Sequence, residues 1–228
     1  MRRALFAGAI LLVNISMGVS AYADRVVTHH FEAGLRAPAV RRVIVEIPAG
    51  EVRVVNSTGN MVRVSGQSKR DYDRWDSHNE QQRIVDDVSA GVFVNGTGDE
   101  ATIRRNFGPN ARGWRIEKFT AIEATVEVPR GVSVELETKY GEIHFDGSFG
   151  DLDVDLRAGE IHANVPRADV RDLDASVMVG EVHARLGDSS INNEGVFPGR
   201  VRWENPSGGR GRIYLHTTAG EIHVQLTR

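Results

Sequence analysis

Hydrophobic and polar residues alternate along several stretches of this chain. Between positions 134 and 138, for example, Val134, Leu136 and Thr138 alternate with Glu135 and Glu137. Successive side chains of a β-strand point to opposite faces, so a period of two predicts strands with one buried face. The positions predicted to face inward are Val43, Val45, Ile47, Val134, Leu136, Thr138, Leu152, Val154, Leu156, Leu173, Ala175, Val177, Ile213, Leu215 and Thr217.

A short motif follows each of these stretches. Gly-Glu-Ile-His, or Gly-Glu-Val-His, begins at Gly141, Gly159, Gly180 and Gly220, with spacings of 18, 21 and 40 residues. A degenerate copy with arginine in place of histidine begins at Gly50. Alternation resumes after each glycine, which predicts a repeat of strand, tight glycine corner and strand, because glycine tolerates positive φ.

One unit of about 20 residues cannot bury its apolar face alone, whereas stacked copies bury a continuous core. The pattern therefore predicts an all-β fold, a single-stranded β-helix or β-solenoid of repeats, spanning residues 24–228 as one domain. A β-sandwich or barrel is the competing architecture. The first three copies are expected on successive rungs, with the Gly220 copy further along.

Two segments interrupt the repeats. In an insertion at about 66–123, Ser77-His78-Asn79-Glu80 reads as a capping box that opens a short helix ending near Val88. Residues 92–94 and 101–103 then flank a loop containing Asn95-Gly96, which is typical of a hairpin. The stretch at about 187–209, rich in Gly, Ser, Asn and Pro, is expected to be a surface loop or an irregular rung.

The first 23 residues have the pattern of a cleavable signal peptide. Arg2 and Arg3 precede an apolar run over 4–13, and Ala21-Tyr22-Ala23 is a small-x-small cleavage site. The apolar run is too short to cross a bilayer, and no later segment approaches the required length. We therefore expect an exported protein, periplasmic or at the cell surface or extracellular, with no transmembrane segment in the mature chain.

The cysteine content and net charge of the chain limit the kinds of partner that we expect. The chain has no cysteine, so no disulfide stabilises it outside the cytoplasm. Removing residues 1–23 deletes two arginines and no acids, which moves the net charge from −3 to −5. No polybasic stretch remains to bind nucleic acid or anionic lipid, so the expected partner is a protein, a glycan or an envelope polymer.

The order of these motifs resembles a known family. Val126-Glu127-Val128-Pro129-Arg130-Gly131 precedes the repeats, and residues 211–224 close them with Gly-Arg-Ile-Tyr-Leu-His-Thr-Thr-Ala-Gly-Glu-Ile-His-Val. Over about 40–66 and 124–228 the chain resembles the bacterial "putative adhesin" family of domains of unknown function, related to toast-rack-like β-solenoids. The resemblance implies an exported β-helix with no enzyme activity and no catalytic residues. Histidine in all four copies departs from the family pattern, in which that residue varies.

The repeated Glu and His residues are candidate metal ligands. Stacked repeats would place them in two outward columns, and imidazole and carboxylate groups suit zinc. A flat column exposed to water lacks an enclosing outer shell, so neither a metal site nor a cofactor is expected. At a pH below about 6.5 a histidine column would become charged and self-repelling. The candidates are Glu142, His144, Glu160, His162, Glu181, His183, Glu221 and His223.

A second set of acids could serve a glycosidase or lyase. Carboxylate pairs at suitable separations perform that chemistry, and stacking would align the acids of successive repeats. No Gly-x-Ser-x-Gly, phosphate-binding glycine loop or His-Glu-x-x-His occurs, so an enzyme is not expected. The acids are Glu135, Glu137, Asp153, Asp155 and Asp174.

Arginine and tryptophan residues are typical interface anchors. Arg202, Trp203 and Arg210, around the late loop, are the candidates, and Trp75 and Trp114 lie near the two ends of the insertion. The leading hypothesis is a non-catalytic, exported, adhesin-like or cell-envelope binding or scaffold protein. A periplasmic metal- or pH-responsive protein that uses the Glu/His columns is the alternative, and a carbohydrate-active enzyme comes third.

Overall fold

The computed structural model describes residues 26–71, 77–107, 120–187, 189–193 and 198–228. The predicted signal peptide, Trp75 and Trp114 lie outside these residues. The strands are β1 Val26–Arg36, β2 Arg42–Glu46, β3 Ala49–Asn56, β4 Met61–Asp71, β5 Val92–Thr97, β6 Glu100–Arg105, β7 Ala121–Val128, β8 Ser133–Asp146, β9 Leu152–Pro166, β10 Val170–Leu186, β11 Ser189–Asn193, β12 Gly199–Glu204 and β13 Gly211–Thr227. One α-helix, α1 His78–Ser89, and a 3-10 turn at Arg167–Asp169 complete the described elements.

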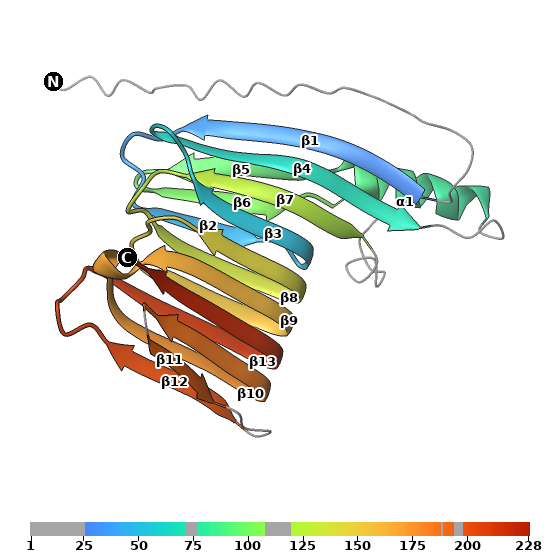
Figure 1. Ribbon diagram of the computed structural model, residues 1–228. Helices are drawn as coiled ribbons and strands as arrows, with labels where there is room; N and C mark the ends of the chain where they lie inside the picture. Colours follow the sequence, from blue (N-terminus) through green and yellow to red (C-terminus); the bar gives the residue numbers. More distant parts are fainter. Residues whose placement is uncertain (1–25, 72–76, 108–119, 188, 194–197) are drawn as a thin grey trace, which may run out of the picture.

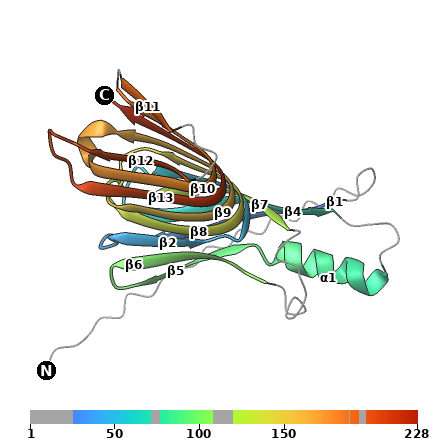
Figure 2. The same ribbon diagram turned by 90° about the horizontal axis from the view of Figure 1, so that it is seen from below.

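The fold is mostly β, as the alternation predicts. Strands β8, β9, β10 and β13 are long and bent, and each contributes to two arms that face each other (Figures 1 and 2). The first arm joins β5, β6, β2, β8, β9, β13, β10 and β12, and the second joins β1, β4, β7, β3, β8, β9, β13, β10 and β11. Every predicted inward position is buried, in one core between the arms.

The repeats pair in parallel and in register. Gly141 of β8 lies opposite Gly159 of β9, Gly159 opposite Gly220 of β13, and Gly220 opposite Gly180 of β10. Strands β2 and β3 together form the equivalent unit before β8, with Gly50 opposite Gly141. The sheet as a whole is mixed, because antiparallel strands extend both ends, so it is not the purely parallel stack that the repeats predict.

The order of the repeats differs from the expected one. The fourth copy, β13, lies between β9 and β10 and pairs with both in parallel. The prediction that Glu221 and His223 lie further along the column is therefore wrong. Identical repeats offer equivalent pairing partners, so their sequence alone does not fix which copies become neighbours.

Within the insertion, the predicted helix is confirmed, whereas the hairpin turn lies three residues further along the chain than predicted. Ser77 caps α1, accepting a hydrogen bond from the Glu80 backbone N–H, while the Glu80 side chain accepts one from the Ser77 N–H. In the β5–β6 hairpin, Thr97 pairs with Glu100, so the turn is Gly98-Asp99 and Asn95-Gly96 lies within β5. A turn of two residues beginning with a positive-φ glycine matches the twist of the flanking strands.

The late segment contains a terminal rung. Strand β11 pairs antiparallel with the second arm of β10, and β12 pairs antiparallel with its first arm.

No helix in the described part of the chain combines the length and apolar character needed to cross a bilayer.

The glycine corners require glycine. Gly159 has φ of +137°, and a Cβ there would lie 1.8 Å from the carbonyl oxygen of Gly141. Since neither backbone can move without breaking the ladder, Gly159→Ala should lower the free energy of unfolding by at least about 3 kcal/mol. Urea unfolding followed by circular dichroism measures this. Gly59→Ala, where a Cβ meets nothing within 4 Å, is the control and should change stability by less than about 0.5 kcal/mol. Equal midpoints for the two variants would contradict the corner's role.

Candidate functional site

The second arm presents an outward surface that we call the ladder face. Residues at alternate positions after each glycine corner point to the same side, and the parallel register brings equivalent residues of neighbouring strands into rows. The first row is Glu51, Glu142, Glu160, Glu221 and Glu181; the second is Arg53, His144, His162, His223 and His183; the third is Asp146, Asn164, Gln225 and Arg185.

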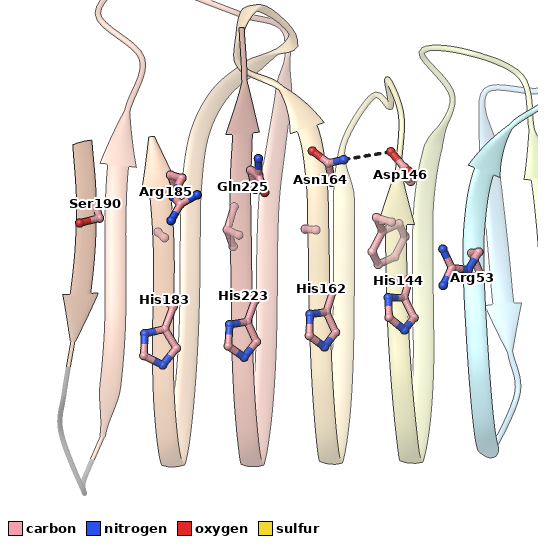
Figure 3. Close-up of a pocket in the computed structure, with 14 residues that line it drawn as sticks. Arg53, His144, Asp146, His162, Asn164, His183, Arg185, Ser190, His223 and Gln225 are labelled. Carbon is pink, nitrogen blue, oxygen red and sulfur yellow. Dashed lines mark hydrogen bonds between the residues drawn. The ribbon is translucent and has the colours of Figure 1, made fainter. Parts of the chain in front are cut away.

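The four histidines form a continuous stack (Figure 3). Ring centroids of His144 and His162 are 4.9 Å apart, those of His162 and His223 4.9 Å, and those of His223 and His183 5.0 Å. The rings are within 15° of parallel. This separation is close to the spacing of hydrogen-bonded strands, so the backbone ladder sets the stacking distance.

Each histidine contacts the glutamate of its own strand. The Nε2 atom lies 2.8 Å from a carboxylate oxygen in His144–Glu142, 3.1 Å in His162–Glu160, 3.1 Å in His183–Glu181 and 3.0 Å in His223–Glu221. The histidine side chains are 20–37% exposed and these glutamates 46–51%. Along β8, β9, β13 and β10 the first two rows thus repeat the same chemistry, with partly buried histidines beside more exposed glutamates.

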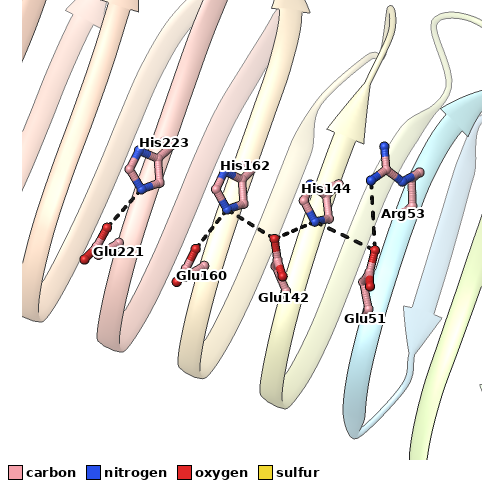
Figure 4. Close-up of polar contacts among 8 residues, drawn as sticks. All are labelled: Glu51, Arg53, Glu142, His144, Glu160, His162, Glu221 and His223. Carbon is pink, nitrogen blue, oxygen red and sulfur yellow. Dashed lines mark hydrogen bonds and ion pairs between the residues drawn. The ribbon is translucent and has the colours of Figure 1, made fainter.

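Glutamate–histidine contacts between neighbouring strands are found at the β3–β8–β9 end of the ladder face (Figure 4). Glu142 Oε1 lies 3.5 Å from Nε2 of His162 on the next strand, in addition to its contact with His144. His144 lies 4.0 Å from Glu51, which in turn lies 3.9 Å from Arg53. A chain of polar contacts therefore runs from Arg53 to Glu160 across β3, β8 and β9.

Two hollows lie along this side of the sheet. One, of about 540 Å³, follows the histidine row from Arg53 to Ser190 on β11 and includes Asn164, Gln225 and Arg185 in its lining. The other, of about 500 Å³, extends over β3, β7, β4 and β1 and is lined by His30, Glu51, Arg53, Gln67 and Glu123 among others. Arg53 borders both hollows.

The first arm carries the acids considered for catalysis. The predicted column of Glu135, Asp153 and Asp174 is interrupted, because Tyr214 of β13 lies between Asp153 and Asp174. Several acids on this arm form ion pairs with arginines: Arg42 pairs with Glu135, Arg104 with Glu46, and Arg200 with Asp174. These pairs place opposite charges on adjacent strands, which stabilises a sheet face.

Pairing with arginine lowers the pKa of Asp174. The Arg200 guanidinium donates hydrogen bonds to both carboxylate oxygens, and Arg202 lies 3.2 Å away. The Arg200 hydrogen bonds, together with the charges of both arginines, hold the pKa of Asp174 below its ordinary value. A general acid at neutral pH needs the opposite shift.

The interaction candidates in the late segment occupy different surroundings. Arg202 faces outward on β12 beside Asp174, whereas Trp203 packs partly buried against the core with the Arg167 guanidinium 5.2 Å above its ring. Arg210 is exposed and donates its backbone N–H to the Asp169 carbonyl. Because Arg202 and Trp203 lie on opposite sides of β12, they do not form one surface patch.

Sequence reasoning found two rows of the ladder face and missed the third. Asp146, Asn164, Arg185 and Gln225 each lie five residues after a repeat glycine. Their side chains differ in type, so no repeated letter marks them, although the alternation continues through their positions. Their shared feature is a polar side chain that can hydrogen-bond, and Asn164 Nδ2 donates to Asp146 Oδ1 at 3.1 Å.

The geometry defines the class of protein, which is an all-β protein with a ladder of polar side chains. Comparisons with known proteins found similar structures of low sequence identity. No protein-family model and no curated protein matches the chain. A structure described as "a putative cell adhesion protein" from Clostridium sporogenes ATCC 15579 is similar with a TM-score of 0.46 and 8% identity, covering 88% of this chain and 100% of that one. "A putative adhesin" from Bacteroides fragilis NCTC 9343 has a TM-score of 0.28 and 8% identity, covering 90% and 98%. The descriptions of both structures are consistent with the resemblance of this chain to the putative adhesin family.

The Asp174 pair makes stability depend on pH. A lowered carboxyl pKa adds stability that is complete above the unfolded value of about 3.9 and is lost as the pH falls through the folded value. Because the pair is partly exposed, Asp174→Asn should cost about 0.5–1 kcal/mol at pH 7, and the difference from the unchanged protein should shrink below about pH 4. Urea midpoints at pH 7, 5 and 3 measure it, with Asp153→Asn as the control. An undiminished gap at pH 3 would show that the charge of Asp174 is not the cause.

Proposed function

We propose that this chain is an exported, non-catalytic binding or scaffold protein of adhesin-like or cell-envelope type, and that its ladder face contacts a protein, a glycan or an envelope polymer. The observation that carries the proposal is the in-register repetition of the same exposed polar groups across β8, β9, β13 and β10. A periodic row along a hollow offers equivalent contacts to an elongated partner at several successive positions.

The architecture supports this proposal. We interpret β2–β3, β8, β9, β13 and β10 as a short β-solenoid, because each unit has the same inward residues, the same glycine corner and the same register. Stacked repeats characteristically provide extended binding surfaces. The antiparallel strands β11 and β12, of 5 and 6 residues, end the sheet at β10 with short edges, which limits edge-to-edge aggregation and leaves the outward faces for recognition.

The chemistry of the two faces favours binding over catalysis. On the first arm, arginine pairing stabilises ionised carboxylates. On the ladder face, the third row offers amide, carboxylate and guanidinium groups, which can donate and accept hydrogen bonds with a polar polymer. Export rests on the pattern of residues 1–23.

Binding is tested by sedimenting the purified protein with an insoluble cell-envelope fraction of the source bacterium. The double variant Asn164→Ala/Gln225→Ala removes two hydrogen-bonding side chains from the ladder face. At about 1 kcal/mol each, their loss should weaken binding roughly tenfold or more. Glu137→Ala/Asp155→Ala, on the first arm of β8 and β9, is the matched control and should bind as the unchanged protein does. Equal binding by both double variants would place recognition elsewhere.

Location is tested by protease treatment of intact cells followed by fractionation and blotting. Loss of the protein from unbroken cells indicates the surface and an adhesive role. Protection until the outer envelope is opened indicates the periplasm and a scaffold role. Recovery of an unprocessed chain from the cytoplasm would contradict export.

A further inference from the structure

Glu142, Glu160 and His162 bring three potential metal ligands together between β8 and β9. One ligand atom from each lies within 4.8 Å of the others. His162 Nε2 lies 3.5 Å from Glu142 Oε1 and 3.1 Å from Glu160 Oε2. With metal–ligand bonds of about 2.0–2.1 Å, two ligands on a tetrahedral zinc ion lie roughly 3.4 Å apart. The two histidine–glutamate separations are therefore already close to those required by one ion.

From this geometry we propose that Glu142, Glu160 and His162 form a binding site for a divalent transition-metal ion of the zinc class. Two carboxylates neutralise the charge of the ion, and the neutral imidazole binds it through Nε2 with its proton on Nδ1. The Glu160 side chain is exposed, so it can rotate to bring its carboxylate oxygen closer to that of Glu142. The fourth position faces solvent and is open to water or to a group from a partner.

Neighbouring side chains hold Glu142 in position as a ligand. Nε2 of His144 lies 2.8 Å from Oε1 of Glu142, so His144 acts as an outer partner that orients this carboxylate. Arg53 lies 3.9 Å from Glu51 at the far end of the contact chain, which places a fixed cation next to the corresponding gap between β3 and β8. That cation disfavours a metal ion there and leaves the gap between β8 and β9 as the preferred position.

The remaining histidines provide an internal comparison. Among the described residues, the ion-pair contacts of His223 and His183 are with the glutamates of their own strands. A site held by one imidazole and one carboxylate lacks the third ligand. The proposal thus distinguishes positions that share the same sequence motif.

Zinc titration by isothermal calorimetry tests the proposal on the purified protein, with zinc chloride as the probe. One tight equivalent is expected. His162→Ala should weaken it by more than the roughly tenfold to hundredfold that outer-shell partners typically carry. His183→Ala, whose histidine has the same 3.1 Å contact with its glutamate, should leave it unchanged. Absence of a tight equivalent, unchanged affinity of His162→Ala, or equal losses in both variants would overturn the site.

A second pair of variants excludes loss of folding as the explanation. Glu142→Gln and Glu181→Gln preserve side-chain shape, and circular dichroism verifies the fold of each. Only Glu142→Gln should weaken zinc binding, and the reverse result would overturn the assignment. The site does not rest on the polymer-binding function, because the titration contains no envelope material and the polymer test leaves all three ligands in place.

Discussion

The backbones of neighbouring strands meet at the glycine corners, and this close approach determines the rest of the structure. Each corner glycine has φ between +127° and +140°, and in each case a Cβ would lie 1.7–2.0 Å from a carbonyl oxygen on an adjacent strand. A side chain at any of these positions would push the strands apart. The column of glycines therefore fixes the register between strands, and with it which residues become neighbours on both faces.

Register then produces rows on both sides of the sheet. On the inner side, aliphatic side chains of equivalent positions pack against one another in one continuous core. On the outer side, the same register places imidazole over imidazole at 4.9–5.0 Å. Like groups on adjacent strands repel when charged, but the glutamates beside the histidines supply opposite charge whenever an imidazole is protonated.

The two arms use different electrostatic solutions although they belong to the same strands. On the first arm, arginines from β2, β6 and β12 pair with acids of β8, β2 and β10. On the ladder face, glutamates pair with histidines, which are weaker and conditional cations. Permanent ion pairs thus hold Glu135, Glu46 and Asp174 on the first arm, while the ladder face keeps groups that can exchange a partner for a ligand. This asymmetry is why we assign recognition to the ladder face.

Local pattern in the sequence determined much of this arrangement. Alternation identified the buried positions, the repeated glycines identified the corners, and Ser77 with Glu80 identified the start of α1, because each depends on residues close together in the chain. It also identified the Glu and His rows as outward. Tertiary structure alone decided that β13 lies between β9 and β10, which breaks the acidic column with Tyr214 and places His223 inside the histidine stack. It alone brought Glu142 near His162, whereas the ion-pair contact of His183, among the residues that the structure describes, is with the glutamate of its own strand. The reason is that near-identical repeats can pair in any order, and the choice among them depends on how distant segments pack and connect rather than on the repeats themselves.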